Sequence, residues 1–122
     1  MITEDYVSFE IAKLLKEKGF NECCPVKYKY VKEFGDYLRT SEYVYYGFEK
    51  YYYPCPTLEM AMKWLRVVHK LHIRIDRASK YWNYTIRKLR PSSTKDLSYN
   101  VDFNTYEQAC EAAIKHCLEN LI

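Results

Sequence analysis

Glycine is scarce in this sequence: there are three, Gly19, Gly35 and Gly47, in 122 residues. A loop that cradles a nucleotide phosphate needs several glycines close together, so the glycine-rich nucleotide-binding motifs are excluded. No segment approaches the roughly 20 apolar residues that a membrane-spanning helix requires. Residues 1–5 also lack the basic stretch and the apolar run of a secretion signal. We therefore expect a cytoplasmic protein without a membrane partner.

Recognisable catalytic and metal-binding patterns are also missing. The five cysteines are an odd number without a regular framework, so we expect free thiols. Cys23 and Cys24 are adjacent, and His69 and His72 lie on either side of a predicted helix end, unlike the paired ligands of zinc sites. No Ser or Cys lies in a nucleophile motif. We expect no metal, no cofactor and no enzymatic activity, unless the fold gathers titratable groups in a deep pocket.

Apolar residues are abundant, with hydrophobic residues at 48% of the chain and aromatic residues at 17%. This composition is typical of globular proteins and argues against the disordered and fibrous classes. A chain of 122 residues has the usual length of one domain and can bury about two thirds of its unfolded surface. We therefore expect residues 1–122 to fold as a single domain.

A short helix-start signature occurs three times, beginning at Ser8, Thr57 and Thr105. In each copy a hydroxyl group can accept a hydrogen bond from a backbone N–H of the first turn, and a glutamate two residues later suits the positive end of the helix dipole. The apolar spacing that follows predicts helices over residues 8–18, 57–70 and 106–120. The copies are roughly 48 residues apart, a spacing that would also fit a duplicated unit.

Extended segments lie between the first two predicted helices. Residues 27–30 alternate lysine with tyrosine at the period of a strand, and residues 34–36 form a turn signal. A second strand is predicted over residues 43–48, with a bulge at Gly47. A short third strand is predicted over residues 51–53, before two prolines end the pairing.

The segment between the last two helices also reads as strands. Residues 72–76 and 81–89 alternate apolar and polar side chains on either side of a turn at 78–80, which is typical of a hairpin. Residues 97–103 alternate in the same way, and the sequence leaves open whether they add an edge strand. The expected fold is α+β in two layers, an antiparallel sheet with helices packed on one face, in the element order α-ββ-α-ββ-α.

Tyrosine is over-represented, with 14 residues in the chain. A strand with rings on both sides must cover two surfaces, of which one can be the core and the other a protein partner, since tyrosine is enriched at interfaces. The alternative is an amphipathic sheet whose phenol groups reach water. We expect a non-catalytic protein-interaction module that binds a protein partner or a second copy of itself. The candidate contact residues are Tyr43, Tyr45, Tyr46, Tyr51, Tyr52 and Tyr53.

Positive charge is concentrated in the predicted hairpin. Residues 63–95 carry ten Lys and Arg residues against one acidic residue, whereas the whole chain has a formal net charge of only +3. Basic side chains interleaved with aromatic rings can hold phosphates and stack on bases, so nucleic-acid binding is the alternative function. The simpler interpretation is that Trp82 and Tyr84 belong to the core and the cations form a solvated face. The candidate phosphate contacts are Arg74, Arg77, Lys80, Arg87, Lys88 and Arg90.

Several segments carry a resemblance to other proteins, namely residues 16–20, 56–66, 72–75, 105–107 and 117–122. The chain resembles a group of small uncharacterised proteins of gut anaerobic bacteria and their prophages. The matching segments are helix caps and core stripes. The resemblance implies a cytoplasmic accessory protein borne by a phage or another mobile element, and it carries over no activity and no site residue.

Overall fold

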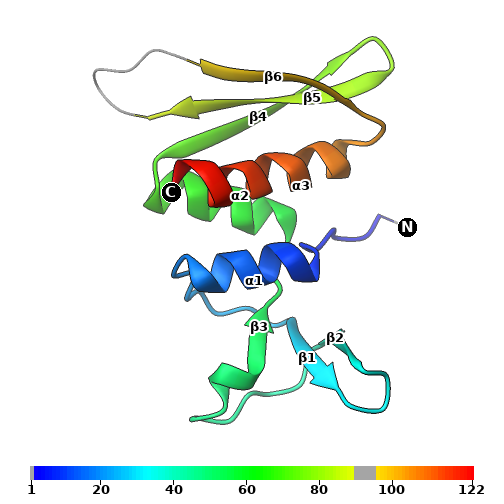
Figure 1. Cartoon of the computed structure of the whole chain (residues 1–122), viewed down its shortest axis with the longest axis vertical. Coiled ribbons are helices and arrows are strands. Elements are labelled where there is room, and N and C mark those ends of the chain that lie inside the picture. Colours follow the sequence, from blue (N-terminus) through cyan, green and yellow to red (C-terminus); the bar gives the residue numbers. More distant parts are fainter. Residues whose placement is uncertain (1, 90–95) are drawn as a thin grey trace. The chain divides into compact units, whose positions relative to one another are not determined.

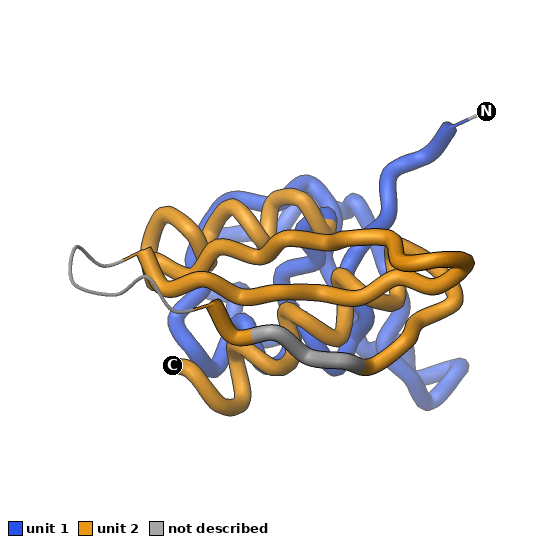
Figure 2. Tube along the Cα trace, turned by 90° about the horizontal axis from the view of Figure 1, so that it is seen from above, with its two compact units in different colours: residues 1–57 blue, residues 58–122 orange. Residues whose placement is uncertain are grey.

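The computed structural model describes residues 2–89 and 96–122. The chain divides into two compact units, Met1–Thr57 and Leu58–Ile122, which Figure 2 shows in blue and orange. The prediction that residues 1–122 form a single domain stays a prediction. In the described part of the chain, no helix is long and apolar enough to cross a membrane.

The first unit combines a helix with a small antiparallel sheet whose strand order is β2-β1-β3 (Figure 1). A turn of 3-10 helix, η1, comes directly before β3. The elements are α1 (Phe9–Glu17), β1 (Lys27–Val31), β2 (Asp36–Thr40), η1 (Glu49–Tyr51) and β3 (Tyr52–Pro54).

Both ends of α1 are fixed by local hydrogen bonds that the sequence signals. The Ser8 hydroxyl accepts a hydrogen bond from the backbone N–H of Ile11 at 3.4 Å, which confirms the predicted cap. At the other end, the Phe20 N–H donates to the Leu15 carbonyl at 2.9 Å, while Gly19 has a φ of +92°. A left-handed glycine followed by a buried apolar residue is the usual way to satisfy the last carbonyls of a helix.

The strand predicted over residues 43–48 is wrong. The tight turn after β1 brings Asp36 opposite Val31, so the second strand begins at once and runs over Asp36–Thr40. Residues 43–48 form a loop in which Gly47 has a φ of +92° and donates its N–H to the Glu49 carboxylate at 2.9 Å. The chain then returns, and β3 pairs along the other side of β1.

The second unit places two helices on one face of a sheet with strand order β4-β5-β6 (Figure 1). Its largest fully buried side chains are aliphatic: Leu65, Ile86, Ile114 and Leu118. The elements are α2 (Leu58–Val68), β4 (Leu71–Ala78), β5 (Tyr81–Lys88), β6 (Asp96–Phe103), α3 (Tyr106–His116) and a final π-helical turn, η2 (Cys117–Leu121).

The α+β class and the three predicted helices are confirmed, and the order of elements agrees in outline. The edge strand that the sequence left open is β6, so each unit has three strands among its described residues. The strands do not form one sheet as expected but two, because each set pairs within its own unit. On α2, Leu58, Ala61, Trp64 and Leu65 are buried, whereas Val68 is exposed.

Candidate functional site

A cluster of aromatic rings joins α1 to the sheet of the first unit. The Phe9 ring stacks on Tyr37 with ring centroids 4.3 Å apart, and it meets Tyr53 and Tyr28 edge-on at 5.2 and 5.5 Å. The Tyr28 hydroxyl is buried and donates a hydrogen bond of 2.7 Å to the Val7 carbonyl. Edge-to-face and offset rings attract one another beyond simple burial, so this cluster fixes the orientation of the sheet.

Beyond this cluster, the rings line an open cleft with a volume of about 570 Å³, which we call the aromatic cleft. The cleft lies where β1 extends past the start of β3, since β3 pairs only with Lys27, Tyr28 and Lys29. Tyr30 and Tyr37 lie opposite each other in register, with ring centroids 5.3 Å apart. The lining residues are Lys29, Tyr30, Tyr37, Phe48, Lys50, Tyr51, Tyr52 and Tyr53.

Lys16, a residue of α1, donates hydrogen bonds to the backbone that forms one wall of this cleft. Its Nζ donates to the carbonyl oxygens of Tyr52 at 2.7 Å, Glu49 at 3.2 Å and Lys50 at 3.4 Å. The same ammonium group lies over the Tyr53 ring, 4.7 Å from its centroid. Burial lowers the pKa of Lys16. The cation therefore satisfies the carbonyls of η1 and holds the segment that carries the clustered tyrosines.

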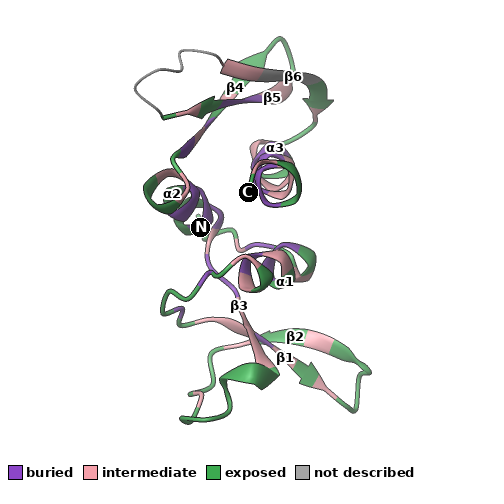
Figure 3. Cartoon of the chain, turned by 60° about the vertical axis from the view of Figure 1, so that its left-hand side comes forward, coloured by how far each residue is buried: buried purple, intermediate pink, exposed green. Residues whose placement is uncertain are grey.

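The six tyrosines predicted as protein contacts fall into two groups. Tyr43, Tyr45 and Tyr46 lie in the loop before η1 and are 75%, 70% and 96% exposed. The other three line the aromatic cleft: Tyr51 is exposed, and Tyr52 and Tyr53 are half-buried. Most of the loop before η1 is coloured as exposed in Figure 3.

Sequence reasoning missed the contribution of Tyr30, Tyr37 and Phe48 to the cleft. The alternation of residues 27–30 and the turn signal at residues 34–36 were visible in the sequence. Pairing the chain directly across that turn would have placed Tyr37 beside Tyr30. Because the second strand was predicted over residues 43–48 instead, the pairing of Tyr30 with Tyr37 was not predicted.

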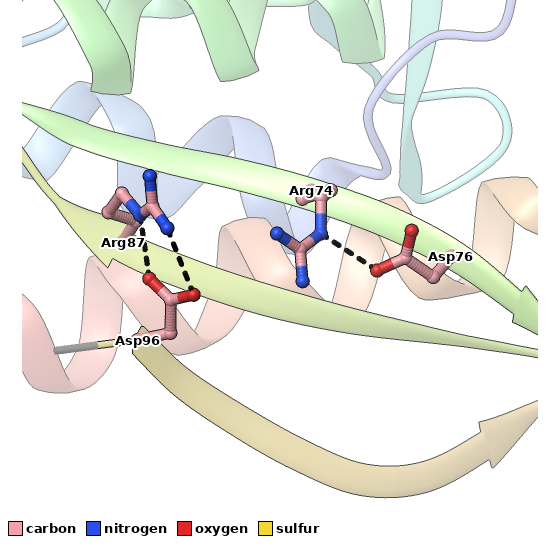
Figure 4. A network of polar contacts seen from close by, with 4 residues as sticks. All are labelled: Arg74, Asp76, Arg87 and Asp96. Carbon is pink, nitrogen blue, oxygen red and sulfur yellow. Dashed lines mark hydrogen bonds and ion pairs between the residues drawn. The ribbon is translucent and has the colours of Figure 1, made fainter.

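The basic hairpin presents paired charges. Arg74 Nε contacts an Asp76 carboxylate oxygen at 2.8 Å, and Arg87 contacts both oxygens of Asp96 at 2.7 and 3.3 Å (Figure 4). The hydrogen bond to Asp96 raises the pKa of Arg87, and the hydrogen bond from Arg87 lowers the pKa of Asp96. Two of the six candidate phosphate contacts are therefore already bound to carboxylates.

The remaining cations of the hairpin are dispersed. Arg77 and Lys80 are exposed and lie over the rings of Trp82 and Tyr81, at 5.6 and 5.5 Å from the ring centroids. Lys88 is half-buried, and Arg90 lies outside the described residues.

Two aromatic side chains of the hairpin, Trp82 and Tyr84, lie toward the helices or the core. Tyr84 is buried, and the Trp82 ring meets the Tyr106 ring of α3 edge-on at 5.5 Å. Arg74 and Arg87 remain exposed, whereas Ile73 and Ile86 are buried. Arg74 and Arg87 therefore lie away from the buried apolar face, whereas Arg77 is the register partner of Trp82 and lies over its ring.

The thiols show little sign of reactive chemistry. Cys110 and Cys117 are fully buried, and burial raises the pKa of each to about 12. Burial also raises the pKa of Cys24 to about 11, whereas Cys23 is exposed. Within residues 2–89 and 96–122, no group of three or more His, Cys, Asp and Glu side chains is arranged to hold a metal ion. A low-pKa thiolate, which nucleophilic catalysis needs, is not provided by these three buried thiols.

Comparison with known proteins found no matching protein family, curated protein or solved structure for this chain.

Proposed function

We propose that this chain is a non-catalytic binding protein that contacts a protein partner, or a second copy of itself, through the tyrosine-rich segment 43–53. The observation that supports the proposal is the exposure of Tyr43, Tyr45 and Tyr46 on a loop whose continuation lines the aromatic cleft. Tyrosine offers a large contact area at low entropic cost, and it is enriched where proteins meet.

The residues that follow this loop in the chain also include exposed aromatic side chains. Phe48 and Tyr51 are 53% and 57% exposed, and they follow the three loop tyrosines within a few residues. Single exposed apolar side chains are normal, but a contiguous group on a soluble protein is typical of an interaction surface. Water contact with these rings would be removed when a partner covers them, which favours association.

Nucleic-acid binding through the hairpin has less support. The ion pairs of Arg74 and Arg87 reduce the positive charge available to phosphates, and phosphate neutralisation is what drives such binding. If the hairpin did bind nucleic acid, Arg74→Glu with Arg87→Glu would abolish retention on heparin or DNA at low salt. Unchanged retention would end that alternative.

The proposed function is tested with a pair of variants that remove exposed apolar surface from different places. Tyr45→Ser with Tyr46→Ser removes rings from the tyrosine-rich loop, and Val67→Ser with Val68→Ser removes exposed apolar side chains from α2 as a matched control. Light scattering measures self-association, and pull-down measures partner capture. We expect only the tyrosine variant to lose association. A wild-type chain that is a strict monomer and retains no partner would contradict the proposal.

A further inference from the structure

The polar side-chain groups that line the aromatic cleft are phenol and ammonium groups. In the described part of the chain, the charged side chains that line it are two lysines, and no carboxylate lines it. The phenol groups can donate hydrogen bonds, as the ammonium groups do. The carbonyl oxygens of Lys50 and Tyr52, which could have accepted hydrogen bonds, already receive them from Lys16. A ligand that fits this cleft therefore offers hydrogen-bond acceptors and flat apolar groups.

A proline-rich peptide has this chemistry. Proline has no backbone N–H, and a polyproline II segment leaves its carbonyl oxygens free for hydrogen bonds from a partner. Its rings pack against aromatic side chains, and its preformed conformation loses little entropy on binding. An ordinary extended peptide has neither these rings nor the preformed conformation.

The two lysines that line the cleft differ in their partners. Lys29 is paired with Glu42 at 2.9 Å. Lys50 lies over the Tyr51 ring at 5.1 Å and, within the described residues, has no carboxylate at ion-pair distance. An unneutralised ammonium group at the rim attracts an anionic side chain of a ligand. A ligand carboxylate would therefore lie beside Lys50.

We propose that the aromatic cleft binds a proline-rich segment of a partner protein, with an acidic residue at the end that reaches Lys50. This inference rests on the proposed function and names the class of its ligand. The volume of about 570 Å³ falls within the usual range for ligand pockets, roughly 300–1,000 Å³. The segment crosses the rings of Tyr30, Tyr51 and Tyr52, and its carbonyl oxygens accept hydrogen bonds from the phenol groups.

The test is fluorescence anisotropy with the whole chain and four labelled probes. The first probe is a polyproline peptide with glutamate at each end, and the second is the same peptide with glutamine ends. The third is a glycine–serine peptide with glutamate ends, and the fourth is an oligothymidine strand. We expect the first probe to bind most tightly, the second more weakly, and the last two not to bind.

Variants locate the binding. Tyr51→Ala should weaken binding of the first probe by about tenfold or more, as truncation of an aromatic anchor does. Tyr51→Phe, which keeps the ring, should weaken it by about fivefold through loss of a hydrogen bond. Phe34→Ala is the control, because Phe34 is an exposed aromatic residue of the same unit that lies outside both the cleft lining and the segment 43–53, and it should change nothing. Thermal melting confirms that each variant is folded.

Charge is tested separately. Lys50→Glu should weaken the glutamate-ended probe by up to about fivefold, the range of an exposed ion pair, and leave the glutamine-ended probe unchanged. Equal losses for both probes would overturn the assignment of the acidic end.

Three other outcomes would overturn the inference. In the first, neither polyproline probe binds, yet Tyr45→Ser with Tyr46→Ser still abolishes partner capture, so the proposed function stands without this ligand. In the second, probe binding and partner capture both fail, and both proposals fall. In the third, oligothymidine alone binds and Tyr51→Ala abolishes it, which assigns the cleft to nucleic-acid bases.

Discussion

In the second unit, three strands of eight residues carry two helices on one face, and aliphatic side chains such as Ile86, Ile114 and Leu118 are fully buried between them. In the first unit, strands of five, five and three residues accompany one helix, and a cluster of rings around Phe9 joins helix to sheet. The strand orders also differ, because the middle strand is the first of its set in one unit and the second in the other. This difference gives no support to a duplicated unit.

The difference between the two units indicates which of them offers a binding site. The open face of the second sheet carries the ion pairs of Arg74 with Asp76 and of Arg87 with Asp96. Short strands bury only part of each large ring, so tyrosines of the first unit remain at the surface as a cleft wall. The first unit therefore combines a fixed ring cluster with exposed aromatic area, which is the arrangement a binding site needs.

The largest effect is expected from a cavity in the aliphatic core of the second unit. Ile114 is fully buried, so Ile114→Ala should lower the free energy of unfolding by about 3 kcal/mol through lost burial and an unfilled cavity. The exposed Val67 on α2 provides the control, because Val67→Ala should change the free energy by less than about 0.5 kcal/mol. Denaturant unfolding followed by far-UV circular dichroism measures both. Equal, small losses would show that the core does not lie around α3.

A smaller effect is expected from the ring cluster of the first unit. Phe9 is half-buried, so Phe9→Ala should lower the free energy of unfolding by about 2 kcal/mol and weaken the near-ultraviolet dichroism of the tyrosines. Unfolding of both variants, Ile114→Ala and Phe9→Ala, is followed by the near-ultraviolet signal of the tyrosines and the far-ultraviolet signal of the helices together. One shared transition would support the predicted single domain, and two separate transitions would contradict it.

The fold was predictable where one local signal decided the structure. Ser8 and Thr105 cap their helices through hydrogen bonds that need only the next turn of chain. The hairpin of β4 and β5 was also predictable, because its alternation continues on both sides of a short turn. The apolar spacing after Thr105 also predicted α3, on which Ala113 and Ile114 are buried, as is Leu118 in η2.

The site was less predictable because tyrosine suits both a buried and an exposed position. Composition identified the segment 43–53 but could not show that Tyr43 stays in a loop while Tyr53 packs against Phe9. That division depends on which strand pairs with β1, a long-range choice. The role of Lys16 was equally hidden, since its carbonyl partners lie more than 30 residues away along the chain.

A local effect is expected from Lys16. Replacing it by methionine keeps most of the apolar stem but leaves the carbonyls of Glu49 and Tyr52 without their ammonium donor. We expect a loss of about 1 kcal/mol, concentrated in the tyrosine-rich segment. Hydrogen exchange should speed up at the Tyr51 amide, which donates to the Phe48 carbonyl.

Lys13→Met is the matched control for Lys16→Met, because Lys13 is an exposed lysine of the same helix. It should leave exchange in the tyrosine-rich segment unchanged. If both variants accelerated exchange equally, the loss of a lysine from α1, rather than the hydrogen bonds of Lys16, would explain the effect. The hydrogen bonds of Lys16 would then not be what holds the exposed rings of the first unit in place.

The smallest effect is expected on the open face of the second sheet. The hydrogen bond from Arg87 lowers the pKa of Asp96 below its ordinary value of 3.8, so the folded state favours the carboxylate more than the unfolded state does. The pair therefore stabilises the fold above about pH 4, and this contribution disappears as the pH falls through the lowered pKa. Asp96→Asn should melt slightly below wild type near neutral pH and should match it in acid, where wild-type Asp96 is protonated. Arg87→Gln should reproduce the neutral difference, because either change breaks the same pair, and a difference from wild type that persisted unchanged into acid would mean that the ion pair is not its source.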